Sequence, residues 1–232
     1  MLDFHVQRNH SPAVQCMLMN LTNSRQTRDR SAVQVLQRIS TTRANSRIGL
    51  AADIAVSFVL LSAGIGRHDL HPTAGVQAII LGLVVFSLVE YCFHRWLFHG
   101  PVRVLEQSHR KHHQMPLAFD ALPFFLPPLG MLVAAAVLAL VLPTSFALLL
   151  SGGLAAGYAA YGLSHTIIHN VRFRHSLPRR WAARHHIHHH HANANFGVTT
   201  PLWDILLGTR YVSKPMRRSD PDRTDARASA KG

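Results

Sequence analysis

The sequence predicts an all-α integral-membrane protein, a bundle of about four transmembrane helices with a histidine-rich cap on the cytoplasmic side. Three observations lead to this fold class. The chain of 232 residues is 48% hydrophobic but only 15% charged, whereas soluble domains are about 25% charged. Its apolar residues gather in long runs, each close to the roughly 20 residues that cross a bilayer as a helix. Its 18 histidines are far more than expected, and most of them follow these runs.

The four apolar runs are expected to be the membrane spans. They cover residues 49–66, 73–93, 122–142 and 144–163. Asp53 lies within the first run, and Pro127 and Pro128 predict a bend or a re-entrant start in the third. Because only Pro143 separates the last two runs, an alternative is a hairpin that dips into the membrane without crossing it fully. Both versions bring the chain back to the same side.

The basic residues predict the orientation. Seven of the 24 Lys and Arg lie in residues 1–47, four in residues 94–121 and twelve after residue 163, and only Arg67 lies elsewhere. Cytoplasmic loops hold the excess of Lys and Arg. We therefore expect a multi-pass protein of the cytoplasmic (inner) membrane, with both termini and the histidine clusters in the cytoplasm. This topology explains the formal charge of +13 without a nucleic-acid partner, which would need a basic face on a soluble domain.

Three parts of the chain are expected. Residues 1–47 form a basic, flexible arm, residues 48–212 form the membrane domain with the metal site, and residues 213–232 form a disordered polar tail. The two cysteines, Cys16 and Cys92, have neither the spacing of a thiolate zinc site nor that of a disulfide framework. Histidine is therefore the metal-binding residue to consider.

Thirteen histidines fall into four clusters, which the topology gathers at one membrane face. The clusters lie at residues 94–99, 109–113, 165–169 and 185–191. On a helix, positions three and four apart share a face. His109, His112 and His113 have this spacing, as do His165 and His169. Each of these sets is therefore expected to present its imidazoles together.

The other two clusters leave a choice and a difficulty. The last cluster has two registers, His186 with His189 and His190, or His185 with His188 and His189. His94 and His99 are five residues apart and need a helix end or a local distortion between them. Glu90, one turn before His94, is expected to accept a hydrogen bond from its imidazole, as carboxylates often do from metal-binding histidines.

About ten neutral imidazoles are more than one tetrahedral ion binds, so we expect two metal ions. An all-histidine site without thiolates keeps the ions cationic and open to O₂ or water. This suits redox chemistry at a membrane surface better than a structural zinc site. The pattern indicates no catalytic residue apart from the metal ligands.

The order and spacing of these clusters resemble the fatty acid hydroxylase and sterol desaturase superfamily of membrane di-iron oxygenases. The matching pieces run from Glu90 to His99, from His109 to Pro116, from Tyr161 to His169, and from His185 through Phe196-Gly-Val-Thr-Thr-Pro-Leu-Trp-Asp204. The resemblance implies two Fe ions, with Zn possible after purification, and O₂ as co-substrate. The ligands it implies are His94, His99, His109, His112, His113, His165, His169, His186, His189 and His190, with His185 and His188 in the alternative register.

The resemblance thus implies an oxidoreductase that hydroxylates a C–H bond in the acyl chain of a membrane lipid, in lipid or fatty acid metabolism. The chain has no flavin or nucleotide fingerprint and no recognisable haem domain, so a separate electron-donor protein is expected. One alternative is a desaturase or a hydroxylase of a sterol-like or carotenoid lipid. A more remote one is a non-catalytic metal-binding or transport protein. A transporter should carry ionisable residues at mid-span, where only Asp53 lies.

Overall fold

The computed structural model describes residues 34–67, 69–119 and 121–213. Its described elements are α2 (Arg43–Ile65), α3 (Pro72–Cys92), the π-helix η1 (Phe93–Phe98), α4 (Arg103–Gln114), α5 (Leu126–Leu138), α6 (Thr144–Asn170), α7 (Ser176–His190) and α8 (Leu202–Leu206). No strand occurs in this described part, so the predicted all-α class is confirmed. Most of the expected N-terminal arm, and the expected tail from residue 214 onward, lie outside the described residues.

Three of the four expected spans are full-length helices. The segments Arg43–Ile65, Pro72–Phe98 and Thr144–Asn170 are long and apolar enough to cross a membrane. The third expected span is instead the helix α5, whose 13 residues extend only about 20 Å, less than the roughly 30 Å of hydrocarbon. Pro127 and Pro128 occupy its first turn, and Pro143 precedes α6, which leaves residues 139–142 in turns.

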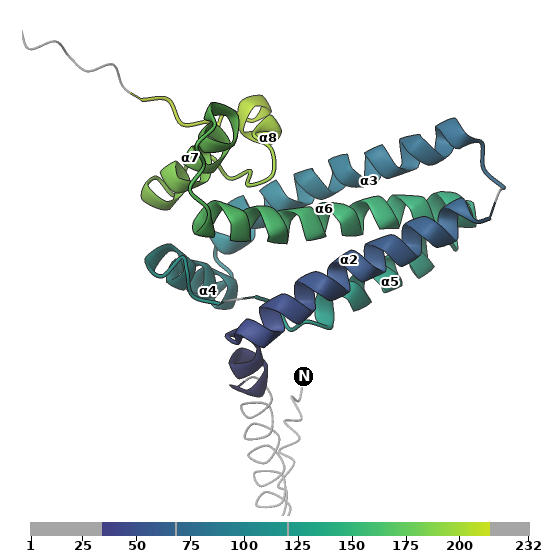
Figure 1. Cartoon of the computed structure of the whole chain (residues 1–232), viewed down its shortest axis with the longest axis horizontal. Coiled ribbons are helices and arrows are strands. Elements are labelled where there is room, and N and C mark those ends of the chain that lie inside the picture. The colour runs from purple at the N-terminus through teal and green to yellow at the C-terminus, as the bar shows by residue number, and fades with distance from the viewer. Residues whose placement is uncertain (1–33, 68, 120, 214–232) are drawn as a thin grey trace, which may run out of the picture.

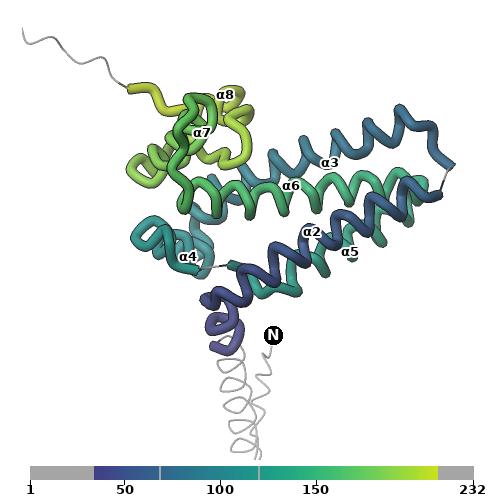
Figure 2. Tube along the Cα trace, in the orientation of Figure 1, coloured from purple at the N-terminus to yellow at the C-terminus, as the bar shows by residue number. Residues whose placement is uncertain are grey.

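The up-and-down order of the helices is nevertheless kept. In Figures 1 and 2, α2, α3, α5 and α6 run alongside one another, and α4, α7 and α8 gather at one end. At this end, the Asn45 side chain donates to the carbonyl of Leu122 (2.9 Å) and accepts from the N–H of Phe124 (2.8 Å). At the other end, the Ser145 hydroxyl at the start of α6 donates to Asp69. Helix α5 thus leads away from the cap, and α6 returns to it.

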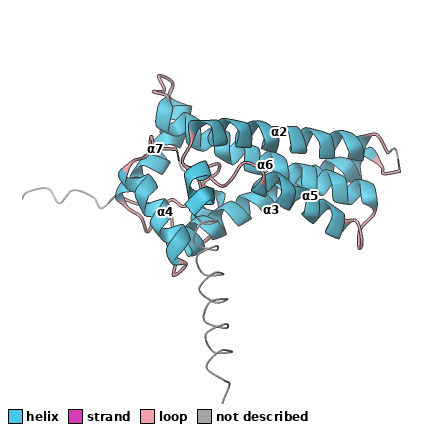
Figure 3. Ribbon diagram, turned by 90° about the horizontal axis from the view of Figure 1, so that it is seen from below, coloured by secondary structure: helices cyan, strands magenta, loops and turns pink. Residues whose placement is uncertain are grey.

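Helix α6 is the centre of the bundle (Figure 3), and it meets α3 almost backbone to backbone. A Cβ atom on Gly82 of α3 would lie 2.3 Å from the carbonyl oxygen of Leu150, and one on Gly153 of α6 would lie 2.5 Å from that of Ile79. Small residues at such contacts are typical of membrane helix pairs, since they allow extensive van der Waals packing. This contact fixes the two helices whose cap-side ends carry histidines.

The cap has a small apolar core of its own. Ile168 at the end of α6, Ala182 of α7 and Val198 of the following loop are all buried and pack together. The Trp181 indole N–H donates to the carbonyl of Val198 (2.9 Å). The end of α6, helix α7 and the loop of residues 191–201 are therefore held against one another beside the histidine clusters.

Candidate metal centre

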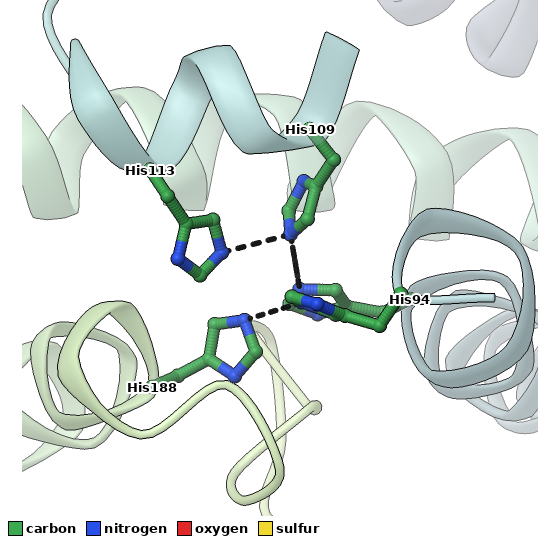
Figure 4. Close-up of side chains that lie close together, drawn as sticks. His94, His109, His113 and His188 are labelled. Carbon is green, nitrogen blue, oxygen red and sulfur yellow. Dashed lines mark hydrogen bonds between the residues drawn. The ribbon is translucent and has the colours of Figure 1, made fainter. Parts of the chain in front are cut away.

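The structure brings ten histidines from all four clusters into two groups of five, and within each group the ligand nitrogens lie within 4.8 Å of one another. Group A consists of His94, His99, His109, His113 and His188. Group B consists of His112, His165, His169, His185 and His189. Helices α4 and α7 contribute to both groups, whereas the α3–η1 segment serves group A and α6 serves group B. Figure 4 shows the rings of four group A histidines, His94, His109, His113 and His188, pointing toward one another.

A π-helix brings His94 and His99 to the same side of the chain. Helix α3 continues directly into η1, and the N–H of His99 donates to the carbonyl of His94, five residues earlier (3.3 Å). This i→i+5 pattern is rare and frequently occurs at functional sites. The two imidazole rings are stacked, with centroids 5.4 Å apart. The distortion that the five-residue spacing requires is therefore present.

The structure brings the histidines of one register of the last cluster into the two groups. His185 and His188 are 1% and 0% exposed, and both belong to the groups together with His189. His186 and His190 are exposed and lie outside both groups. The geometry therefore differs from the register that uses His186 and His190 and agrees with the alternative register.

The anchor of α7 in the cap core explains this register. Trp181 is held by its hydrogen bond to Val198, and His185 follows it by four residues, which places both on the buried face. Arg179 is exposed, and His186 follows it by seven residues, or about two helical turns. The histidines in register with the tryptophan therefore turn inward, and those in register with the arginine turn outward.

The ring nitrogens meet too closely and too often for hydrogen bonding alone. The Nε2 atoms of His94, His99 and His113 lie 3.0, 3.1 and 3.0 Å from a single atom, Nε2 of His109. In a neutral imidazole, Nε2 carries either one hydrogen or one lone pair. It therefore satisfies one N–H···N bond, and three such contacts leave lone pairs or hydrogens facing each other.

A metal ion at the centre of each group would resolve this crowding. In group B, Nε2 of His185 lies 2.9 Å from that of His169 and 3.1 Å from that of His189, and those of His112 and His165 are 2.9 Å apart. A metal–nitrogen distance of about 2.1 Å places neighbouring nitrogens of an octahedral shell about 3 Å apart. The spacing and the donor type thus fit one metal ion per group, and nitrogen donors suit iron and zinc alike.

Backbone carbonyls orient the two most buried histidines of group A. The Nδ1–H of His94 donates to the carbonyl of Phe196, and the Nδ1–H of His188 donates to that of Ala194 (2.8 Å). A hydrogen on Nδ1 leaves the lone pair on Nε2, the atom that faces the group. The loop of residues 194–199, here called the carbonyl loop, therefore sets both the tautomer and the direction of these imidazoles.

Glu90 holds the carbonyl loop and not the imidazole itself. Its carboxylate accepts from the N–H of Val198 (2.6 Å), the N–H of Thr199 (3.0 Å) and the Thr199 hydroxyl. The expected hydrogen bond from His94 to Glu90 is not formed, because that Nδ1–H donates to Phe196. Glu90 thus acts on His94 indirectly, through the position of the loop.

Asp204, at the centre of α8, is a second support of the carbonyl loop and was missed in the sequence. Its side chain is 1% exposed and accepts from the N–H of Phe196 (2.8 Å), the N–H of Gly197 (2.9 Å) and the Thr209 hydroxyl (2.7 Å). The signal available was the acidic residue that ends the Phe196–Asp204 motif. Two buried carboxylates therefore hold the loop that orients His94 and His188.

Burial keeps the imidazoles of the cap neutral. It lowers the pKa of His99 to about 4, and the pKa values of His112 and His188 to about 3. It also lowers the pKa of His109 and His185, and neighbouring imidazoles lower them further. Burial disfavours the charged form of histidine, so these residues present lone pairs near neutral pH.

A cavity of about 220 Å³ opens onto group A. It is lined by Phe98, His99, Glu106, Arg110, His113 and Ala192. Two of these residues are group A histidines, and the Arg110 guanidinium is paired with the Glu106 carboxylate in its wall. The cavity therefore borders this side of the candidate centre.

The fold and these two groups define a helical integral-membrane protein with a candidate two-metal centre at one end of its spans. The sequence model described as fatty acid hydroxylase matches residues 79–209, more than half of the chain. This region contains all ten histidines of the two groups. The chain belongs to the fatty acid hydroxylase family.

Curated relatives carry names consistent with that family. The fatty acid 2-hydroxylase of Rattus norvegicus is 31% identical over 148 residues, covering 58% of this chain and 39% of the relative. The dihydroceramide fatty acyl 2-hydroxylase of Arabidopsis thaliana is 27% identical over 160 residues, covering 62% of this chain and 64% of the relative. The chain thus spans about two fifths of the length of the rat relative and just under two thirds of the plant one.

A solved structure has the same fold. The structure described as full-length Scs7p, with only its hydroxylase domain visible, has a TM-score of 0.65 at 21% sequence identity. The match covers 79% of this chain and 72% of the other. At this identity the likeness concerns the arrangement of the helices.

Proposed function

We propose that this chain is a membrane-bound, O₂-dependent di-iron oxidoreductase that hydroxylates the acyl chain of a lipid. The observation that carries the proposal is the convergence of ten buried or half-buried histidines into two groups of five in a member of the fatty acid hydroxylase family. Relatives named fatty acid 2-hydroxylase and dihydroceramide fatty acyl 2-hydroxylase support the choice of an acyl chain as substrate.

In this proposal groups A and B each hold one iron ion, and residues 48–212 form the catalytic domain. Bound iron supplies the redox chemistry with O₂ that converts a C–H bond to C–OH. The protein contributes neutral imidazoles, kept so by burial, and the carbonyl loop directs two of them. Because such a shell carries no negative charge, the ions keep their full positive charge.

The position of the site suits a substrate that stays in the bilayer. His94 and His99 lie where the long α3 span ends, and His165 and His169 occupy the last two turns of α6. An acyl chain lying along these spans reaches the histidines without leaving hydrocarbon. The distribution of basic residues supports a cytoplasmic position for the cap, where a separate electron-donor protein supplies the two electrons needed per turnover.

Lipid mass spectrometry of expressing cells tests this proposal. Wild-type protein should produce lipids heavier by one oxygen atom, and the variant with His112→Ala and His113→Ala should produce none. The matched control is His186→Ala with His190→Ala, which alters two histidines outside the groups and should keep the product. Lipids lighter by two hydrogen atoms would show a desaturase instead. Unchanged lipids from metal-loaded wild type with its reductant supplied would contradict the proposal.

A further inference from the structure

The short helix α8 presents large apolar side chains on the outside of the cap. Leu202, Ile205, Leu206 and Leu207 are 41, 54, 62 and 47% exposed, and together they are called the α8 row here. Asp204, among them in sequence, is 1% exposed and faces the carbonyl loop. Contiguous exposed apolar surface generally marks a contact with a protein, a ligand or a membrane. The α8 row therefore requires an explanation.

A hydrogen bond fixes the depth of α8 relative to the membrane. The Trp203 indole N–H donates to the Ser87 hydroxyl of α3 (2.9 Å). The apolar span that contains Ser87 runs over the 27 residues Pro72–Phe98, and hydrocarbon accommodates about 20 of them. Every stretch of about 20 residues within this span includes Ser87. Ser87 therefore lies about 6 to 16 Å inside the cap-side edge of the hydrocarbon. Trp203, in contact with Ser87, lies beside a part of α3 that is within the hydrocarbon.

The surface of α3 next to this contact is itself lipid-facing. Ile80, Leu83 and Val84 are 54, 41 and 43% exposed on a helix that spans the membrane, and Val89, further along it, is 39% exposed. Ile80, Leu83 and Val84 lie seven, four and three residues before Ser87 and share its face of α3. Because α8 is attached at Ser87, the α8 row continues this apolar surface. We propose that α8 is embedded in the bilayer and that lipid acyl chains cover the α8 row.

This insertion would act on the candidate metal centre through one helix. The α8 row faces outward, while Asp204 of the same helix accepts from the N–H groups of Phe196 and Gly197. The carbonyl of Phe196 in turn accepts from His94. Hydrocarbon around α8 therefore helps to hold the loop that directs His94. This consequence rests on the proposed metal centre, whereas the depth of α8 does not.

Spin labelling tests the depth directly. In a variant with Cys16→Ser and Cys92→Ser, a nitroxide is attached at Leu206→Cys, and the protein is placed in phosphatidylcholine nanodiscs. Collision rates with O₂, which concentrates in hydrocarbon, and with a water-soluble nickel chelate are then measured. Labels at Val89→Cys and at the exposed His190→Cys provide the hydrocarbon and water references.

The label at position 206 should match the Val89 reference, with frequent collisions with O₂ and few with nickel. A match to the His190 reference would place α8 in water and overturn the proposal. Low collision rates with both reagents would mean that protein, such as a partner or a second copy of the chain, covers the α8 row, and this result would also overturn it.

Zinc retention tests the link to the metal centre. Leu206→Asp should lower zinc affinity in a chelator competition about tenfold, the lower end of the effect seen when groups that support metal ligands are changed. Leu177→Asp, at a site 76% exposed in the first turn of α7, is the matched control and should leave zinc affinity unchanged. Leu206→Ser provides a milder change, expected to act in the same direction. Wild-type zinc affinity in both Leu206 variants would overturn the link.

Discussion

Replacing Asp204 by asparagine tests whether the carbonyl loop controls the metal centre. The change keeps the shape of the side chain and removes its charge. The carboxylate accepts three hydrogen bonds, from the N–H groups of Phe196 and Gly197 and from the Thr209 hydroxyl, at 2.7 to 2.9 Å. An amide has a single acceptor oxygen, so its NH₂ group must face the N–H of either Phe196 or Gly197. One buried backbone donor then loses its acceptor.

The magnitude follows from these contacts. A buried donor without an acceptor costs about 1–3 kcal/mol, and bonds to a charged group are worth about 1.5–3 kcal/mol against about 1 for neutral pairs. Asp204→Asn should therefore lower the free energy of unfolding by about 2–4 kcal/mol. Because the loop directs His94 and His188, zinc or iron affinity at group A should fall about 10- to 100-fold.

Thermal unfolding and chelator competition on purified protein measure both effects. Asp69→Asn is the matched control, since Asp69 accepts from Ser145 at the opposite end of the bundle and its side chain is 48% exposed. The control should leave metal affinity unchanged. If Asp204→Asn kept both the melting temperature and the metal affinity of the wild type, the carbonyl loop would not be what positions these ligands.

Three further changes have expected outcomes. Burial lowers the pKa of His99 to about 4 and that of His112 to about 3, below the usual 6.5 of the unfolded chain. The unfolded state therefore binds more protons between these values, and the metal-free protein should lose stability as the pH falls below about 6.5; a melting temperature that rises on acidification would contradict this. Gly82→Ala places a Cβ 2.3 Å from the carbonyl oxygen of Leu150 and should cost about 1–3 kcal/mol of stability. Gly130→Ala is the control, because no atom lies within 4 Å of its new Cβ, and it should not lower the stability. Equal melting temperatures of the two variants would argue against the α3–α6 contact. Glu90→Gln removes the negative charge to which the N–H groups of Val198 and Thr199 donate. This change should weaken metal binding at group A more than at group B. Equal losses of metal at both groups would show a general folding defect instead.

The sequence predicts which histidine clusters gather at the site better than it predicts the contacts of each side chain there. The four clusters and the return of the chain to one side place the histidines together, because span length and chain order determine on which side each cluster emerges. The register of the last cluster was also available in principle. Trp181 and Arg179 mark the inner and outer faces of α7, so His185 and His188 are on the inner face and His186 is not.

Other features depend on contacts that no local pattern contains. Glu90 was expected beside His94 because the two are one turn apart, yet its carboxylate binds Val198 and Thr199, more than 100 residues later in the chain. The length of α5 was overestimated because hydropathy does not register Pro127 and Pro128 in its first turn or Pro143 before α6. The division of the histidines between groups A and B likewise depends on how α4 lies between α6 and η1.

Metal content per chain tests the central claim most directly. Wild-type protein, loaded with zinc or iron and freed of loosely bound ions, should contain two metal ions per chain, one for each group of five histidines. His99→Ala with His188→Ala should leave one ion, and so should His165→Ala with His185→Ala. His186→Ala with His190→Ala should leave both. One ion or none in the wild type, or a loss in the variant of His186 and His190, would contradict the two-group metal centre.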